Sequence, residues 1–195
     1  MRILISILGM ILCFAQAPAA RAETMQFNPL VSAGLTAGGD TIATYRAEFW
    51  GEEYDADLDL GGTFFMYGGF SLQWPSHDVG MIFQGGFFSS FIGDYDENAD
   101  FTRWPVELIG FVKTEKLRVG LGMTYHFSPT FEEDGFGDNK LKFDDASGWL
   151  LQIEYMFRNV SVGVRHVQID YEIDSSQLDG DHWGLFATYQ FGNQR

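Results

Sequence analysis

Apolar and polar residues alternate along most of this chain with a period of two, which is typical of β-strands that have two different faces. The clearest stretch runs from Leu117 to Phe127, where the odd positions are apolar and the even positions hold arginine, glycine, threonine and histidine. Residues 149–157 and 183–191 repeat this alternation. From these anchors the sequence predicts eight strands, at about 29–38, 62–74, 79–92, 104–113, 117–128, 148–157, 160–171 and 182–192.

The connections between the predicted strands alternate in length. The short ones are 75–78, 114–116 and 158–159, and they hold residues suited to hairpin turns. The long ones are about 39–61, 93–103, 129–147 and 172–181, and they hold most of the acidic residues. Short turns at one end and long loops at the other are typical of an all-β, up-and-down, antiparallel transmembrane barrel with an even number of strands.

One face of each predicted strand carries no charge. Glu107, Arg118 and Glu154 all fall on the opposite face of their strands. A water-soluble barrel would enclose its apolar residues, whereas a lysine or arginine facing lipid costs ~2–4 kcal/mol at the bilayer midplane. We therefore expect the apolar face to contact lipid and the charged face to be enclosed.

The seventh predicted strand departs from this regularity. Its alternation changes phase at Arg165 and His166. A β-bulge adds one residue to a strand and moves the following side chains to the other face. We therefore expect a bulge here, followed by Val167, Ile169 and Tyr171 on the lipid face.

An eight-stranded barrel leaves an interior just wide enough for side chains to fill. The expected interior charges are Glu107, Arg118, Glu154 and Arg165, which balance in sign. Arg165 should lie opposite Gln152 and diagonal to Glu154 across a hairpin, within reach of a long side chain. The sequence therefore predicts an internal ion-pair network rather than a water-filled channel.

Tryptophans recur at equivalent places in the predicted strands. Trp104, Trp149 and Trp183 each occupy the first outward position of an even-numbered strand, and Trp74 lies at the turn end. Amphipathic aromatic rings prefer the two membrane–water interfaces. The pattern predicts two aromatic girdles.

The first residues have the features of a secretory signal peptide. Arg2 precedes an apolar run from Ile3 to Phe14, and Ala20-Arg21-Ala22 provides a small-x-small cleavage site. We expect residues 1–22 to be removed and 23–195 to form the barrel. The whole chain has a formal net charge of −15, and removing Arg2 and Arg21 leaves 10 basic and 27 acidic groups, a net charge of −17.

Composition excludes several classes of function. The strong negative charge disfavours a nucleic-acid partner. The single cysteine, Cys13, excludes a disulfide framework and a zinc site built from several thiolates. The sequence predicts no cofactor and no assigned metal site.

The chain resembles the small eight-stranded outer-membrane barrels of Gram-negative bacteria, the group that contains the transmembrane domain of OmpA-type proteins. Tyr189-Gln190-Phe191 is similar to the aromatic-x-Phe signal that such barrels present to the barrel-assembly machinery, although residues 192–195 follow it here. The resemblance implies an outer-membrane location, contact with lipid and lipopolysaccharide, and both termini in the periplasm. It says little about function, because this scaffold hosts plugs, adhesins and lipid enzymes.

A non-enzymatic structural or surface-interaction barrel without an open pore is the favoured function, and a narrow pore is one alternative. The other alternative is a lipid A-directed acyl hydrolase that uses His126 and Ser128, since a histidine can activate a serine for acyl transfer. This His-x-Ser pair resembles that of outer-membrane lipid A deacylases. In that family an asparagine follows the serine, whereas Pro129 follows it here.

The acidic loops raise the question of a divalent cation. Asp55, Asp57 and Asp59 aim to one side of an extended segment, and hard cations prefer such carboxylate oxygens. Their spacing is not that of an EF-hand loop. A solvated acidic surface is the simpler interpretation, and a Ca²⁺ or Mg²⁺ ion at the acidic loops is the alternative.

Overall fold

The computed structural model describes residues 25–49, 52–93, 98–134, 139–174 and 176–192. The predicted signal peptide at 1–22 lies outside these residues. The strands are β1 (Gln26–Ala37), β2 (Thr41–Phe49), β3 (Glu52–Asp59), β4 (Phe64–Trp74), β5 (Val79–Gly93), β6 (Asn98–Lys113), β7 (Leu117–Asp134), β8 (Asn139–Lys142), β9 (Ala146–Phe157), β10 (Val160–Ile173), β11 (Ser176–Asp179) and β12 (His182–Gln190), with a 3₁₀ turn at Pro75–His77.

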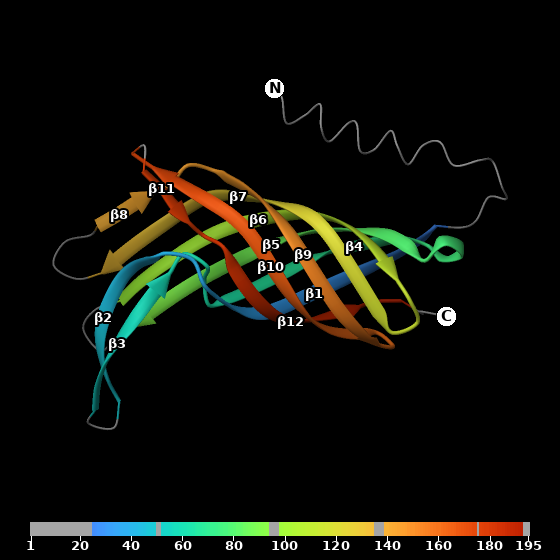
Figure 1. Ribbon diagram of the computed structural model, residues 1–195, viewed down its shortest axis with the longest axis horizontal. Helices are drawn as coiled ribbons and strands as arrows, with labels where there is room; N and C mark the ends of the chain where they lie inside the picture. Colours follow the sequence, from blue (N-terminus) through green and yellow to red (C-terminus); the bar gives the residue numbers. More distant parts are fainter. Residues whose placement is uncertain (1–24, 50–51, 94–97, 135–138, 175, 193–195) are drawn as a thin grey trace.

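The predicted eight-stranded antiparallel barrel is confirmed. Its strands pair around the ring in the order β1, β4, β5, β6, β7, β9, β10 and β12, and β12 pairs with β1 to close it. The short turns lie at one end of the barrel, together with the start of β1 and the end of β12 (Figure 1). The long connections all lie at the other end, called the loop end below.

The long connections contain strands that the sequence analysis assigned to loops. Strands β2 and β3 pair with each other and project away from the barrel (Figure 1). At the loop end β8 pairs with β7, and β11 pairs with β10. Because acidic residues are uncommon in strands, the sequence predicted a loop at these positions rather than β2 and β3. In the structure Thr44 Oγ1 donates to Asp57 Oδ1 at 2.8 Å and Thr41 Oγ1 donates to Asp59 Oδ1 at 2.9 Å, so hydroxyl donors on β2 partner carboxylates of β3.

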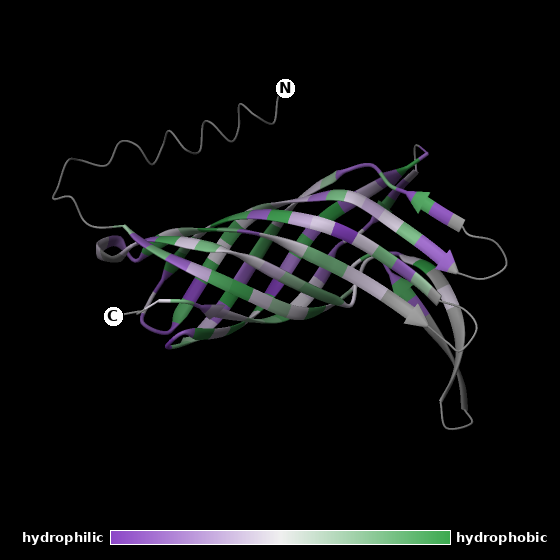
Figure 2. Cartoon of the chain, turned by 180° about the vertical axis from the view of Figure 1, so that it is seen from behind, coloured by the Kyte–Doolittle hydropathy of each residue, from purple (hydrophilic) through white to green (hydrophobic). Residues whose placement is uncertain are grey.

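The two faces of the barrel wall are sorted as the sequence predicts. Apolar side chains such as Leu121, Leu151 and Ile153 are exposed on the outside, and Glu107 and Glu154 are buried inside. Figure 2 shows the resulting alternation of hydrophilic and hydrophobic residues along each strand. Soluble monomers rarely expose so large a continuous apolar surface, so this exterior is the lipid-facing surface of a membrane barrel.

No helix in the described part of the chain is both long enough and apolar enough to cross a membrane.

The bulge predicted at Arg165 and His166 is wrong. The pairing of β10 with β9 runs without interruption from Val160 to Ile169. Val167, Ile169 and Tyr171 therefore stay on the inner face, where all three are buried. The change of phase in the sequence has another cause: towards the loop end the interior becomes an ordinary hydrophobic core, so apolar residues occupy the face that is polar further down.

The bulge lies instead in β7. Thr102 pairs with Thr130 and Trp104 pairs with Phe127, which places Ser128 and Pro129 opposite the single residue Arg103. Ser128 adopts a positive φ of 45°, which a non-glycine residue accepts only where the surrounding structure holds it.

Candidate functional site: interior and loop end of the barrel

Arg118 and Glu154 form an ion pair inside the turn-end half of the barrel. They lie directly opposite each other on β7 and β9. Arg118 donates from Nε to Glu154 Oε1 at 2.8 Å and from Nη2 to Glu154 Oε2 at 2.5 Å, which is a bidentate contact. Ser161 and Gln152 donate to the same carboxylate at 2.5 and 2.9 Å. Four hydrogen bonds therefore compensate the buried charge of Glu154.

Glu107 and Arg165 form a second buried ion pair, which crosses the interior from β6 to β10. Arg165 Nη2 donates to Glu107 Oε1, and Gln84 Nε2 donates to Glu107 Oε2 at 2.7 Å. The Arg165 guanidinium also lies over two rings, at 5.2 Å from the centroid of Phe65 and 5.5 Å from that of Tyr67. Cation–π contacts of this kind help to stabilise a desolvated guanidinium.

The structure thus brings the four predicted interior charges together in two pairs. Arg165 does lie opposite Gln152. The carboxylate of Glu154, however, is paired with Arg118 rather than with Arg165. Directly opposed residues lie closer than diagonal ones, and the register of β7 against β9 puts Arg118 in the opposed position.

A third buried arginine was missed by the sequence analysis. Arg103 lies on β6 with no exposed surface, and its Cζ is 3.9 Å from the centroid of the Phe88 ring. Phe101 and Tyr171 lie at 5.0 and 5.4 Å from the same carbon. We call these four residues the Arg103 cluster. Arg103 was assigned to a loop, although its position four residues before Glu107 places it on the inner face if the strand is extended.

The end of β3 and the residues that follow it cover the loop end of the interior. Leu58 and Leu60 are buried, and Arg103 Nη1 donates to the carbonyl of Leu60. Ser90 Oγ donates to the carbonyl of Asp59 at 3.0 Å. Gly62 has a φ of +76°, and a Cβ there would lie 1.9 Å from the Phe88 ring, so only glycine fits at this closure.

His126 and Ser128 are not brought together. His126 is buried inside the barrel, and its Nδ1 lies 2.6 Å from the hydroxyl of Tyr171. Ser128 is exposed at the bulge, where its backbone N–H donates to Asp145 Oδ1 at 2.9 Å. The bulge reverses the alternation after Phe127, so the expected shared face does not exist. The pair therefore lacks the hydroxyl–imidazole contact that nucleophilic activation needs.

Several described acidic residues at the loop end are solvent-exposed. Asp144, just before β9, and Glu172, near the end of β10, are both exposed, and the Asp144 N–H donates to the Glu172 carbonyl at 3.0 Å. Within the described ranges, no three histidine, cysteine, aspartate or glutamate residues are grouped so that they could hold a metal ion. Asp57 and Asp59 accept the hydroxyl hydrogen bonds from β2 described above.

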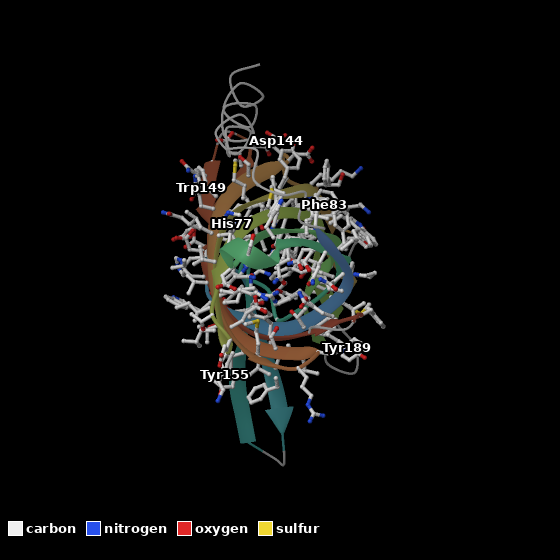
Figure 3. The ribbon with its side chains drawn as sticks, turned by 90° about the vertical axis from the view of Figure 1, so that its right-hand side faces the viewer. His77, Phe83, Asp144, Trp149, Tyr155 and Tyr189 are labelled. Carbon is white, nitrogen blue, oxygen red and sulfur yellow. The ribbon has the colours of Figure 1, made fainter. Side chains whose placement is uncertain are left out.

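The residues expected in the girdles lie on the outer surface or at its edge. Trp104, Trp149 and Trp183 are exposed, and Trp74 is half-buried at the end of β4. Figure 3 looks along the barrel from the turn end and shows side chains filling the interior, while Tyr155 and Tyr189 lie outside the wall. Tyr189 and Phe191, the predicted assembly signal, are both exposed and contact each other with ring centroids 4.8 Å apart.

Comparisons with solved structures find the same fold in other proteins. No protein-family model matches the chain, and no curated protein does. A similar solved structure is that of Ail, the attachment invasion locus protein of Yersinia pestis, in complex with the heparin analogue sucrose octasulfate; the TM-score is 0.55 at 12% identity, over 86% of this chain and 100% of that one. Another is Neisserial surface protein A, with a TM-score of 0.50 at 12% identity, over 87% of this chain and 100% of that one. This chain therefore shares the β-barrel fold of these two outer-membrane proteins.

Proposed function

We propose that this protein is a closed, non-enzymatic barrel of the outer membrane that acts through the acidic surface at its loop end. The observation that supports this proposal is the set of buried side chains that occupy the interior. Ion pairs fill the turn-end half, rings fill the middle, and Leu58 and Leu60 cover the loop end. Chemistry available to an external partner is then confined to the loops. The separation of His126 from Ser128 supports the non-enzymatic part.

The negative charge of the loops indicates which kind of partner the loop end would bind. Asp40, Asp144, Glu172 and Asp174 are exposed around the loop end. Ail was solved with a polyanionic sulfated sugar, and an acidic surface repels such a ligand at short range. We therefore propose a partner with a cationic surface. Lipopolysaccharide contacts would be made by the apolar wall, and Tyr189 and Phe191 would engage the barrel-assembly machinery.

A narrow pore is the alternative that conductance measurements address. We expect no conductance steps when the purified barrel is inserted into planar lipid bilayers, because two ion pairs and the Arg103 cluster occupy the lumen. The control is a larger porin inserted under identical conditions. Reproducible ion-conducting steps from the purified protein would contradict the closed-barrel proposal.

Binding of a polycation tests the acidic surface. We expect the barrel in nanodiscs of neutral lipid to bind poly-L-lysine with an affinity that falls as salt rises, and not to bind sucrose octasulfate. Neutralising Asp144 and Glu172, as Asp144→Asn with Glu172→Gln, should weaken poly-L-lysine binding at least threefold.

The matched control neutralises two exposed acids at the turn end, as Asp78→Asn with Glu115→Gln. This pair should have a clearly smaller effect than the loop-end pair. Equal effects of the two pairs, or tight binding of sucrose octasulfate, would contradict a partner-binding role for the loop end.

A further inference from the structure

The guanidinium of Arg103 has one edge without a partner. Its Nη1 donates to the Leu60 carbonyl, but neither Nε nor Nη2 has a hydrogen-bond partner among the described residues. These two nitrogens form the same edge of the planar guanidinium, and their N–H bonds point in one direction. Burying such donors without partners costs free energy of the order of 1–3 kcal/mol or more.

The same edge of Arg118 binds a carboxylate. Its Nε and Nη2 hold the two oxygens of Glu154 at 2.8 and 2.5 Å. The donor edge that binds a carboxylate in Arg118 is therefore without a hydrogen-bond partner in Arg103. Arg118 and Arg103 both lie on the inner wall, and of these two only Arg118 has a carboxylate at this edge.

The charges inside the barrel also favour an anion. The buried acids Glu107 and Glu154 are matched by Arg165 and Arg118, and Arg103 is left as an additional positive charge among the described residues. No carboxylate in the described part of the chain forms an ion pair with it. Desolvated charges in protein interiors are normally paired.

The neighbouring histidines have other hydrogen-bond partners. His182 Nδ1 lies 2.8 Å from the Gly180 carbonyl, and His126 Nδ1 is engaged by the Tyr171 hydroxyl at 2.6 Å. The Phe88 ring stacks on one face of the guanidinium, as described above. The centroid of this Phe88 ring lies 5.3 Å from that of the His182 ring and 6.2 Å from that of the His126 ring. Stacking covers the face of the guanidinium plane and not its donor edge.

We propose that Arg103 binds a small monocarboxylate inside the loop end of the barrel, through a bidentate contact of Nε and Nη2 with the two carboxylate oxygens. A planar anion of single negative charge matches both the geometry of the edge and the one uncompensated positive charge. The site is covered by the chain around Leu60, so the ligand is taken up while the barrel folds or when this segment moves aside. This site goes beyond the proposed surface function and does not depend on it.

Refolding in the presence of a carboxylate tests the proposal and avoids the question of entry. The barrel is folded from denaturant into detergent in sodium formate, sodium acetate, sodium chloride or sodium sulfate, at equal ionic strength, and its melting temperature is measured in the same buffer. At a tenfold excess over the dissociation constant, formate or acetate should raise the melting temperature by about 3–6 °C relative to chloride. A rise with sulfate alone would assign the edge to tetrahedral oxyanions and overturn the carboxylate assignment.

Three variants test whether the rise in melting temperature in formate depends on Arg103. Arg103→Lys keeps the positive charge but lacks the two-nitrogen edge, so its melting temperature should be the same in formate and chloride. Arg103→Met, which removes the buried charge, should behave in the same way and serves if the lysine variant folds poorly. Arg118→Lys is the matched control: it alters an arginine whose edge Glu154 already fills, so the response to formate should persist.

Equal melting of the wild-type protein in formate, acetate and chloride would overturn the proposal. So would a formate response that survives both replacements of Arg103. Neither outcome would affect the binding of poly-L-lysine at the loops, so the two proposals fail separately.

Discussion

Replacing Glu154 with glutamine should lower the free energy of unfolding by about 3–5 kcal/mol, the usual effect of breaking one partner of a buried ion pair. The Glu154 carboxylate accepts four hydrogen bonds, two of them from Arg118. The amide of glutamine would turn a donor towards those donors and leave the Arg118 charge unpaired in the interior. Denaturant unfolding of the barrel in detergent or lipid measures the loss.

Glu172→Gln is the matched control for this change. It makes the same substitution on an exposed carboxylate of β10, and its effect should stay within about 0.5 kcal/mol. Joint replacement of Arg118 and Glu154 by methionine should cost much less than Glu154→Gln, because no charge is left buried. If Glu154→Gln unfolded like the wild type, the stabilising role of the ion-pair network would be contradicted.

Replacing Leu121 with arginine should destabilise the barrel in a lipid bilayer by ~2–4 kcal/mol, the cost of a lipid-facing arginine near the midplane. Leu121 lies midway along the outward positions of β7 and is 56% exposed. In a water-soluble protein a leucine this exposed could be replaced by arginine at almost no cost. Reversible unfolding from lipid vesicles measures the difference.

Leu141→Arg provides the comparison. Leu141 is 47% exposed on β8, which extends the sheet at the loop end, so its replacement should change the unfolding free energy by less than about 0.5 kcal/mol. Leu121 and Leu141 are similarly exposed, so a larger loss of unfolding free energy at Leu121 would indicate that Leu121 contacts lipid. Small and equal effects at both positions would show that the exterior of the barrel faces water.

The wall of the barrel was predictable because each strand faces two different environments. Charged residues are unfavourable on the face that contacts lipid, so they lie on the face that lines the lumen. Apolar and polar residues therefore alternate along each strand with a period of two. This local rule assigned Glu107, Arg118, Glu154 and Arg165 to the interior without knowledge of any contact. It failed for Val167, Ile169 and Tyr171, because the rule reverses where the strands leave the bilayer and enclose a hydrophobic core.

The contacts within the site depended on register. The sequence predicted Arg165 within reach of Glu154, but the alignment of β7 with β9 pairs Glu154 with Arg118 instead. The bulge at Ser128 likewise separated two residues that are only two positions apart. Neither alignment nor bulge has a signal in the local alternation.

By itself, the sequence determined the number of membrane-spanning strands, the face that each presents to lipid, and the end at which the acidic loops gather. These properties are set residue by residue, by the solvent next to each side chain. Only the tertiary structure decided that Arg118 rather than Arg165 binds Glu154, that His126 and Ser128 point apart, and that Arg103 is buried with two donors that have no hydrogen-bond partner. Those outcomes depend on how strands far apart in the chain align when the sheet closes, and closure is a property of the whole barrel.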